Sequence, residues 1–324
     1  MKVICYGELM IDMIAKGRQS ICEATDFCKH AGGAAANVAT QISKLGGQAA
    51  FLGKLGDDAF GHYLMQYMRR HKVDTQGVVV DPARRTTVAF IGLDEQGIPS
   101  YLFYRAGGAS ETITPADMDE SYIKQADIVY SSSLMLTAPQ VRETTKWIFQ
   151  ICKAQGIVVA FDLNLRLSAY ESAAKARETV KDIFPQLDIL KINDTELDFL
   201  LDKESEPVEG GKSLLAQYPN LRVLIITCGA EGAYLLRQDG QPVFMAARQV
   251  KAIDTTGAGD SYMGAFLYAY GLFEGDLSRL ECMAEWAAAV AELTVQGHGA
   301  IDAMPDFANV QAYCNQNHIQ LRVK

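Results

Sequence analysis

Beyond residue 110 the sequence alternates regularly between short apolar runs and longer helical patterns, and this alternation constrains the fold most. Apolar runs of strand length occupy 128–132, 157–161, 189–192 and 223–227. Helical patterns separate them, the longest over 139–155. Strands that alternate with helices form parallel sheets covered by helices on both faces. We therefore predict an α/β fold with a doubly wound, mostly parallel sheet flanked by helices.

Two β-rich stretches, at about 13–31 and 84–108, interrupt this pattern and contain no helix. We predict that both contribute to one small sheet, packed over an edge of the main domain as a lid. Two further apolar runs, 233–236 and 243–245, predict an antiparallel ribbon at the edge of the main sheet. With no repeat or long linker, residues 1–324 are expected to form a single domain.

Net charge and cysteine content limit the partners and the cellular compartment that we expect for this protein. The net charge of −9 argues against nucleic acid or an anionic membrane as the main partner. The N-terminus lacks the features of a signal peptide, and no apolar run approaches the roughly 18 residues of a membrane span. The seven cysteines form no C-x-x-C pair, which is typical of reduced thiols. We predict a cytoplasmic protein.

A glycine-rich turn, Asp-Thr-Thr-Gly-Ala-Gly-Asp at 254–260, leads into an apolar helical pattern. The N–H groups that begin a helix lack intrahelical acceptors and form a ready anion site. Glycine lets a ligand approach that backbone closely. Asp260 falls in the first turn, where a carboxylate would repel a bound phosphate unless it accepts a proton from the attacking group. The turn therefore predicts phosphoryl transfer with Asp260 as the base.

Alternative interpretations of such motifs fit less well. Asp254 or Thr256 could simply cap a core helix, but a cap does not need the second carboxylate. The spacing from the turn to Gly264 differs from the dinucleotide-binding fingerprint. Gly-Lys-Ser at 211–213 lacks the P-loop's first glycine, because position 206 is Glu206. The five histidines form no pair with metal-ligand spacing.

Polar side chains follow the expected strands where each strand ends, and ligands of such sheets bind beyond those ends. These residues are Asp12 after the first strand, Asp162, Asn164 and Arg166 after 157–161, Asn193 and Glu196 after 189–192, and Thr227 and Gly229 after 223–227. Gly32 and Gly33, with Asn37 one turn later, either allow close helix packing or let a polyhydroxy ligand touch the backbone. Tyr101 and Phe103 alternate along a lid strand, so both can face one ligand.

Two long stretches resemble the signatures of the ribokinase-like (PfkB) carbohydrate kinases. Residues 32–56, which include Asn37, resemble the N-terminal signature, and residues 254–265 resemble the C-terminal one without a gap. With the lid pattern and Thr-Cys-Gly-Ala-Glu-Gly at 227–232, the resemblance covers essentially the whole chain. It implies an ATP-dependent sugar kinase that uses Mg²⁺ and often a monovalent cation such as K⁺.

The resemblance also implies roles for individual residues. It makes Asp260 the catalytic base and the amides of Gly257, Ala258 and Gly259 an anion hole for the γ-phosphate. The nucleotide, its phosphates and Mg²⁺ are assigned to Asp162, Asn164, Lys191, Asn193, Glu196, Thr227, Gly229 and Gly232, with Glu196 acting indirectly on the metal. The sugar is assigned to Asp12, Gly32, Gly33, Asn37, Tyr101, Phe103, Arg105 and Arg166. Asp254 and Thr256 are candidates for the monovalent-cation site.

Within the family, Phe-Tyr-Arg at 103–105 and Asp-Leu-Asn-Leu-Arg at 162–166 look most like fructokinases and 2-keto-3-deoxygluconate kinases. The resemblance implies fructose as the acceptor first. The alternative is 2-keto-3-deoxygluconate, whose carboxylate could pair with Arg105 and Arg166. A non-catalytic sugar-binding protein on the same fold is a third hypothesis, disfavoured because Asp260 and the glycine turn are intact. We also expect a homodimer through the lid.

Overall fold

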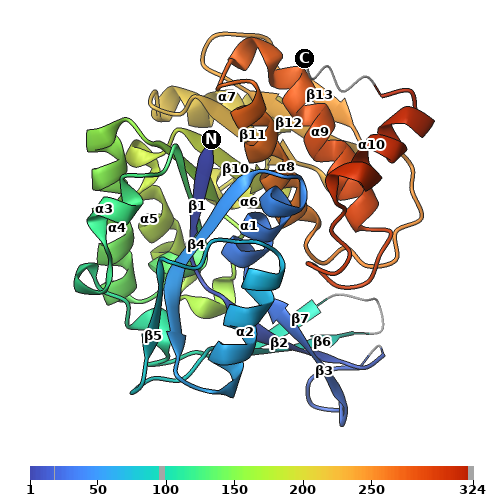
Figure 1. The fold of residues 1–324 in the computed structure, drawn as a ribbon. Coiled ribbons are helices and arrows are strands. Elements are labelled where there is room, and N and C mark those ends of the chain that lie inside the picture. The colour runs from blue at the N-terminus through green and yellow to red at the C-terminus, as the bar shows by residue number, and fades with distance from the viewer. Residues whose placement is uncertain (18, 95–98, 320–324) are drawn as a thin grey trace.

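A computed structural model describes residues 1–17, 19–94 and 99–319, and it contains two sheets (Figure 1). The larger sheet has nine strands. Their spatial order is β13 (Val243–Ala246), β12 (Gly232–Leu236), β11 (Val223–Thr227), β10 (Ile189–Asn193), β9 (Val158–Asp162), β8 (Ile128–Ser132), β1 (Lys2–Tyr6), β4 (Gln48–Gly56) and β5 (Val78–Asp81). Neighbouring strands from β11 to β5 are parallel, and β12 and β13 add antiparallel pairs at one edge. The predicted mostly parallel sheet and its edge ribbon are confirmed, whereas the short edge strand β5 was not anticipated.

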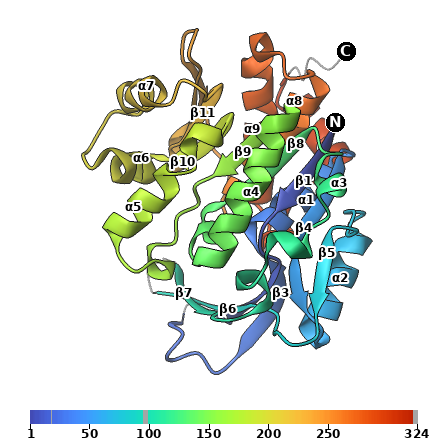
Figure 2. The same cartoon turned by 90° about the vertical axis from the view of Figure 1, so that its left-hand side faces the viewer.

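Helices cover both faces of this sheet (Figure 2). They are α1 (Ala34–Lys44), α2 (Ala59–Arg70), α3 (Glu120–Ile123), α4 (Pro139–Gln155), α5 (Ala173–Lys181), α6 (Asp194–Leu201), α7 (Pro207–Gln217), α8 (Ala258–Leu272), α9 (Leu280–Thr294) and α10 (Phe307–Gln316). Side chains of β1 alternate between two hydrophobic cores, Val3 and Cys5 in one and Ile4 and Tyr6 in the other. The first core contains α1, α2 and α8–α10, and the second contains α3–α7. Among the helices that the structure describes, none has the length and apolar character needed to cross a bilayer.

A second sheet of four strands lies at one end of the body (Figure 2). Its order is β3 (Phe27–Gly32), β2 (Met10–Ala15), β6 (Val88–Leu93) and β7 (Pro99–Tyr104). The central pair, β2 and β6, is parallel and joins the two N-terminal β-rich stretches. The predicted small sheet is therefore present. Asp12 lies within β2 rather than after the first strand of the main sheet, because the chain turns away at 7–9 and pairs again only in the small sheet.

Helices α1 and α8 pack closely and run side by side. The side chain of Asn37 in α1 meets Asp260 in α8, and Gln41 of α1 lies against Gly264 of α8. The second contact lies four residues after the first in both helices. The two helices therefore run in the same direction, and their first turns are neighbours. A Cβ atom on Gly264 would lie 2.8 Å from the Cβ atom of Gln41, closer than carbon atoms pack. The absence of a side chain at Gly264 thus permits this approach.

Replacing Gly264 with alanine should lower the free energy of unfolding by about 1–3 kcal/mol, the usual cost of overpacking a core. Gly271 in the same helix is a matched control, because a Cβ atom there would lie an ordinary 3.4 Å from the Met1 side chain. Gly271→Ala should leave stability unchanged or raise it by about 0.5–1 kcal/mol through helix propensity. Urea denaturation of both variants measures the difference, and equal effects would contradict this account of the contact.

Candidate functional site

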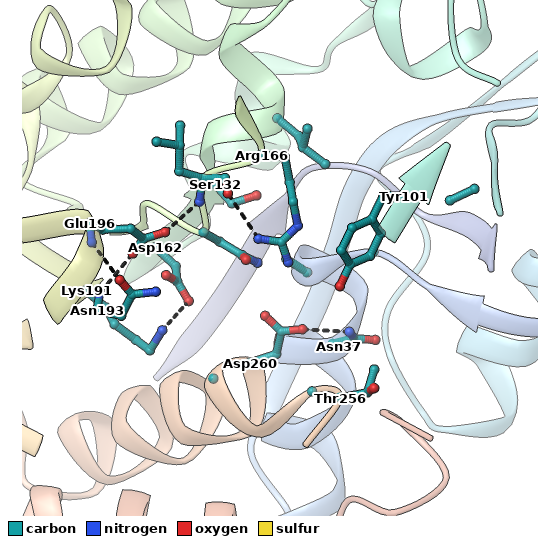
Figure 3. Close-up of a pocket in the computed structure, with 18 of the residues that line it drawn as sticks. Asn37, Tyr101, Ser132, Asp162, Arg166, Lys191, Asn193, Glu196, Thr256 and Asp260 are labelled. Atoms are coloured by element: carbon teal, nitrogen blue, oxygen red, sulfur yellow. Dashed lines mark hydrogen bonds and ion pairs between the residues drawn. The ribbon is translucent and has the colours of Figure 1, made fainter. Parts of the chain in front are cut away.

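A cavity of about 580 Å³ opens at the carboxyl ends of the main-sheet strands, beneath the small sheet. It is the place where parallel α/β sheets bind ligands. The structure brings most of the predicted site residues into its lining (Figure 3). They are Asp12, Gly33, Asn37, Tyr101, Phe103, Asp162, Asn164, Arg166, Lys191, Asn193, Glu196, Thr227, Thr256, Gly257, Gly259 and Asp260.

A second cavity of about 570 Å³ adjoins the first, and Thr227, Thr255 and Gly259 line both. Three more predicted residues line the second cavity, namely Gly229, Gly232 and Ala258. Its remaining walls are largely small and apolar, with Ala288 of α9 among them. Such walls suit a flat aromatic ring better than a polyhydroxy ligand. The two cavities meet at the first turn of α8.

The glycine turn gives α8 an N-terminus open to a ligand. Gly257 is the N-cap residue, with φ 79° in the left-handed region, and no side chain caps the helix in the described structure. A Cβ atom on Gly257 would lie 2.7 Å from that of Ala300. Backbone and packing both therefore require glycine here. The N–H of Ala258 donates to the carbonyl oxygen of Thr255 at 3.2 Å, so the turn itself uses that amide.

Two acidic side chains, the buried Asp260 and the half-buried Asp12, line the first cavity. Asn37 donates a hydrogen bond to Asp260, with 2.7 Å between Nδ2 and Oδ2. Burial raises the pKa of Asp260 to about 6, although the Asn37 hydrogen bond opposes the shift. Burial raises the pKa of Asp12 to about 7, and the negative charge of Asp260 adds to that effect. Asp260 is thus a carboxylate whose pKa suits proton transfer near neutrality.

An ion pair lies under the opposite side of the glycine turn. Lys191 Nζ is 2.9 Å from Asp162 Oδ2, and the two residues are 5% and 1% exposed. The other carboxylate oxygen of Asp162 has no hydrogen-bond partner within the described chain. A Cβ atom on Gly259 would lie 3.2 Å from Lys191 Nζ, so the ammonium group reaches the turn. A buried cation therefore lies close to the proposed anion site.

Asn193 and Glu196 form a capping box at the start of α6. Glu196 accepts hydrogen bonds from the N–H groups of Leu165 at 2.6 Å and Asn193 at 2.8 Å. Burial raises the pKa of Glu196, and the nearby Asp162 adds to the shift. Both oxygens of this carboxylate are engaged, so it orients the backbone around the cavity. Within the described residues, no group of three or more His, Cys, Asp or Glu side chains could hold a metal ion.

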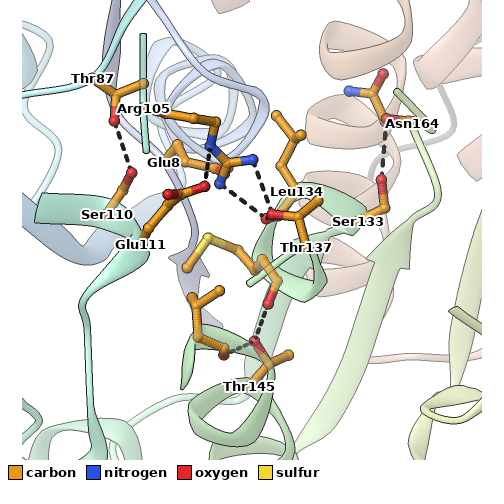
Figure 4. Close-up of polar contacts among 12 residues, drawn as sticks. Glu8, Thr87, Arg105, Ser110, Glu111, Ser133, Leu134, Thr137, Thr145 and Asn164 are labelled. Carbon is orange, nitrogen blue, oxygen red and sulfur yellow. Dashed lines mark hydrogen bonds and ion pairs between the residues drawn. The ribbon is translucent and has the colours of Figure 1, made fainter. Parts of the chain in front are cut away.

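The structure does not bring Arg105 to the cavity, contrary to the sequence prediction. Its guanidinium NH2 lies 2.9 Å from Glu8 Oε1 and its Nε lies 3.1 Å from Glu111 Oε1 (Figure 4). It also donates to Thr137 Oγ1 and to the carbonyl oxygen of Leu134. The reason is that β7 ends at Tyr104, so Arg105 follows the chain out of the small sheet into the body. Arg105 is a buried structural ion-pair residue.

Gly32 and Asp254 also lie outside the lining of both cavities. A Cβ atom on Gly32 would lie 1.8 Å from Asp12 Oδ2, so Gly32 makes room for that carboxylate. Asp254 accepts hydrogen bonds from the N–H groups of Thr256 and Gly299, both at 2.9 Å. These bonds tie the glycine turn to the loop after α9. Both residues therefore support the residues that line the cavities without lining the cavities themselves.

Several lining residues escaped the sequence analysis. The first cavity also includes Met10, Ala34, Ala89, Ile91, Ser132, Leu134, Leu165, Leu167, Thr195, Phe199 and Thr255, and the second Tyr262, Arg248, Gln249 and Glu292. Thr255 lies within the glycine turn and could have been found from that motif. Glu292 lies in the middle of α9, where no sequence pattern marks it. Arg166, which was predicted as a site residue, lies over the ring of Tyr101, with 5.1 Å between its Cζ atom and the ring centroid.

The arrangement provides the parts needed for phosphoryl transfer. A poised carboxylate, a helix N-terminus without a cap and a buried lysine converge where a polar cavity meets an apolar one. Helix N–H groups and lysine stabilise phosphoryl oxygens, and the carboxylate can take the proton of an attacking hydroxyl. The geometry therefore fits a nucleotide on one side of the turn and an alcohol on the other.

Comparisons with known proteins agree with this geometry. Residues 1–306 match the model of the pfkB family carbohydrate kinase. The chain is 34% identical to fructokinase-2 of Solanum lycopersicum over 310 residues, 94% of this chain and 93% of the relative. The crystal structure of a fructokinase with bound ATP from Xylella fastidiosa has a TM-score of 0.86, 27% identity, and coverage of 98% and 99% of the two chains. A fructokinase double mutant from Vibrio cholerae O395, in a fructose, ADP and potassium ion bound form, has a TM-score of 0.86, 28% identity, and coverage of 96% and 97%.

The family match spans nearly the whole chain, and the curated relative exceeds 30% identity over almost its full length. The fold agrees with that match, because the similar fructokinase structure has a TM-score of 0.86 over 98% of this chain. This chain therefore belongs to the pfkB family of carbohydrate kinases.

Proposed function

We propose that this protein transfers the γ-phosphate of ATP to a primary hydroxyl of fructose and produces fructose 6-phosphate. One observation carries the proposal: the buried carboxylate of Asp260 lies in the first turn of an uncapped helix, between a polar and an apolar cavity. The names of the similar proteins, fructokinases from a plant and from bacteria, support fructose as the acceptor.

In the proposed reaction the sugar lies against Asp12, Gly33, Asn37, Tyr101 and Phe103, and the nucleotide base enters the second cavity. Asp260 accepts the proton of the attacking hydroxyl. The amides of Gly257 and Gly259, with Lys191, stabilise charge that develops on the phosphoryl oxygens. The small sheet acts as a lid that keeps water from the γ-phosphate.

The residues present fit an Mg²⁺ ion that is held mainly by phosphate oxygens and water. Asp162 offers a buried oxygen that has no hydrogen-bond partner among the described residues, and Glu196 fixes the backbone beside it. When bound, Mg²⁺ neutralises phosphate charge. A monovalent cation near Asp254 and Thr256 would depend on backbone carbonyls, because both oxygens of Asp254 already accept hydrogen bonds.

Charge in the sugar cavity favours a neutral ketose over 2-keto-3-deoxygluconate. Asp12 and Asp260 both line the proposed sugar cavity, and each would repel a carboxylate ligand in its ionised form. Of the two arginines considered, Arg105 is engaged with Glu8, which leaves Arg166. The acid therefore remains the alternative substrate and depends on Arg166 alone. A non-catalytic sugar-binding protein is a poor fit, because the base and the anion site are both in place.

We also propose a cytoplasmic homodimer joined through the lid. Leu102 and Tyr104 on β7 are 45% and 63% exposed. Phe90 packs edge-to-face between Tyr104 and Phe27, with ring centroids 5.6 and 5.2 Å apart. An exposed aromatic face on a small open sheet is typical of a surface that a partner covers. A second copy of the chain offers the same face.

Asp260→Asn should lower turnover by about 10²- to 10⁴-fold, because the amide cannot accept the hydroxyl proton. The KM for ATP should change little, since the variant keeps the shape of the first turn. Asp239→Asn, an exposed change between β12 and β13, is the control and should keep normal turnover. Coupled detection of ADP with fructose and Mg²⁺ provides the measurement. Near-normal turnover of the Asp260 variant would show that Asp260 is not the catalytic base and has only a structural role in the first turn of α8.

The two arginines should behave differently. Arg105→Ala leaves Glu8, which is 1% exposed, without its cation and should lower the free energy of unfolding by about 3–5 kcal/mol. Arg166→Ala should keep stability and alter only kinetics. If 2-keto-3-deoxygluconate were the substrate, its KM would rise about tenfold to a hundredfold in the Arg166 variant. If the wild type turned over only the acid, and the Arg166 variant showed this rise in KM, the acid and not fructose would be the substrate.

Tyr104→Glu should dissociate the proposed dimer, because it places a charge on the exposed aromatic face. Leu272→Glu is the matched control, since Leu272 is 40% exposed at the other end of α8. Light scattering at micromolar concentration should give a dimer for the wild type and the control, and a monomer for Tyr104→Glu. A monomeric wild type would rule out the lid interface.

A further inference from the structure

We propose that Asn37 is a positioning residue for the base: its amide nitrogen holds the ionised Asp260 carboxylate, and its oxygen accepts a hydrogen bond from a sugar hydroxyl. This inference rests on the proposed role of Asp260 as the proton acceptor. It gives Asn37 a part in the chemical step in addition to the sugar contact expected from the sequence.

The geometry fixes which way the Asn37 amide points. Its Nδ2 donates to Asp260 Oδ2 over 2.7 Å, and the two side chains are 6% and 9% exposed (Figure 3). An ionised carboxylate only accepts hydrogen bonds, so the NH₂ group must face it and the oxygen must face away. The close contact of Gly264 with Gln41 keeps α1 and α8 in register. Asn37 and Asp260 are thus held by two rigid helices.

The oxygen of the same amide is left for a ligand. Asn37 Oδ1 is buried and has no hydrogen-bond partner among the described residues, and Asn37 lines the sugar cavity. A buried acceptor without a donor is costly. A sugar hydroxyl that donates to it removes that cost and leaves its own oxygen free for other contacts. Sugar binding and orientation of the base therefore depend on one side chain.

The charges around Asp260 explain why such a donor matters. The acidic side chains of Asp12 in β2 and Asp162 in β9 lie near it, and so does Tyr130 of β8. Lys191 of β10 and Arg166 after β9 are the cations that act on it. Burial outweighs these cations and raises the pKa of Asp260, and the Asn37 hydrogen bond is the largest opposing effect. Without that donor the pKa of Asp260 would be higher, and a smaller fraction of the carboxyl would be ionised and able to act as a base near neutral pH.

The test compares Asn37→Ala, Asn37→Asp and wild type by two measurements, with the exposed Asn309→Asp as a control for added charge. The first is the pKa of Asp260 in ligand-free protein, followed by ¹³C NMR of labelled aspartate carboxyls and assigned by the signal lost in Asp260→Asn. The second is the pH dependence of kcat with fructose. Thermal unfolding checks that each variant is folded.

We expect the Asp260 pKa and the acidic limb of kcat to move up together by about one pH unit in Asn37→Ala, and further in Asn37→Asp, where a second carboxylate replaces the donor. The KM for fructose should rise at least about tenfold in Asn37→Ala, with the KM for ATP unchanged. Asn309→Asp should match the wild type.

An unchanged Asp260 pKa and an unmoved acidic limb, with only the KM for fructose raised, would overturn the proposal and leave Asn37 as a sugar ligand alone. If Asn37→Ala does not fold, the isosteric Asn37→Asp decides the question. The NMR titration needs no turnover. A wild type that phosphorylates no fructose would therefore refute the proposed function, while the titration would still decide whether Asn37 controls Asp260.

Discussion

The contact between α1 and α8 is the constraint on which the site depends. These helices begin at two glycine turns that are far apart in the sequence, and each helix delivers one polar residue from its first turn. Their close approach relies on Gly264, which has no side chain to separate them. Because both helices are buried in the same core, small movements of one against the other are resisted by packing. The distance between Asn37 and Asp260 is therefore set by the core rather than by a loop.

Buried charge is the second theme of the structure. The pairs Lys191–Asp162 and Arg105–Glu8 each place a cation and an anion within 2.9 Å in the interior. Removing water from a charge costs several kcal/mol unless partners replace it, so isolated charges are avoided. Arg105 satisfies this requirement away from the cavity, and its ion pair with Glu8 connects the segment after β7 to the segment after β1. Lys191 satisfies it at the cavity, where a phosphate could share the cation.

The two cavities differ in a way that suits the ligands proposed for them. The first cavity is rich in carboxylates and amides, and the second is lined largely by small apolar residues. Among the described residues, Thr255 and Gly259 of the glycine turn and Thr227 at the end of β11 border both cavities. In the proposed reaction the transferred group lies at the backbone N–H groups of that turn, close to Asp260 and Lys191. The division into two cavities provides the alignment that in-line transfer needs.

The sequence by itself determined the alternating fold, the glycine turn and most residues of the cavity. These features are local: strand and helix periodicity, the backbone freedom of glycine, and the rule that parallel strands end at one edge. Only the tertiary structure decided the partner of each polar side chain. Arg105 directly follows a strand of the small sheet, which is a position typical of ligand-binding residues. In the structure, however, its guanidinium forms an ion pair with Glu8, 97 positions earlier in the chain. Asp12 follows the first strand in sequence but belongs to another sheet, and Gly32 serves that carboxylate. The sequence shows which polar side chains are present. Burial and contacts between distant residues decide which of these side chains remain free to bind a ligand.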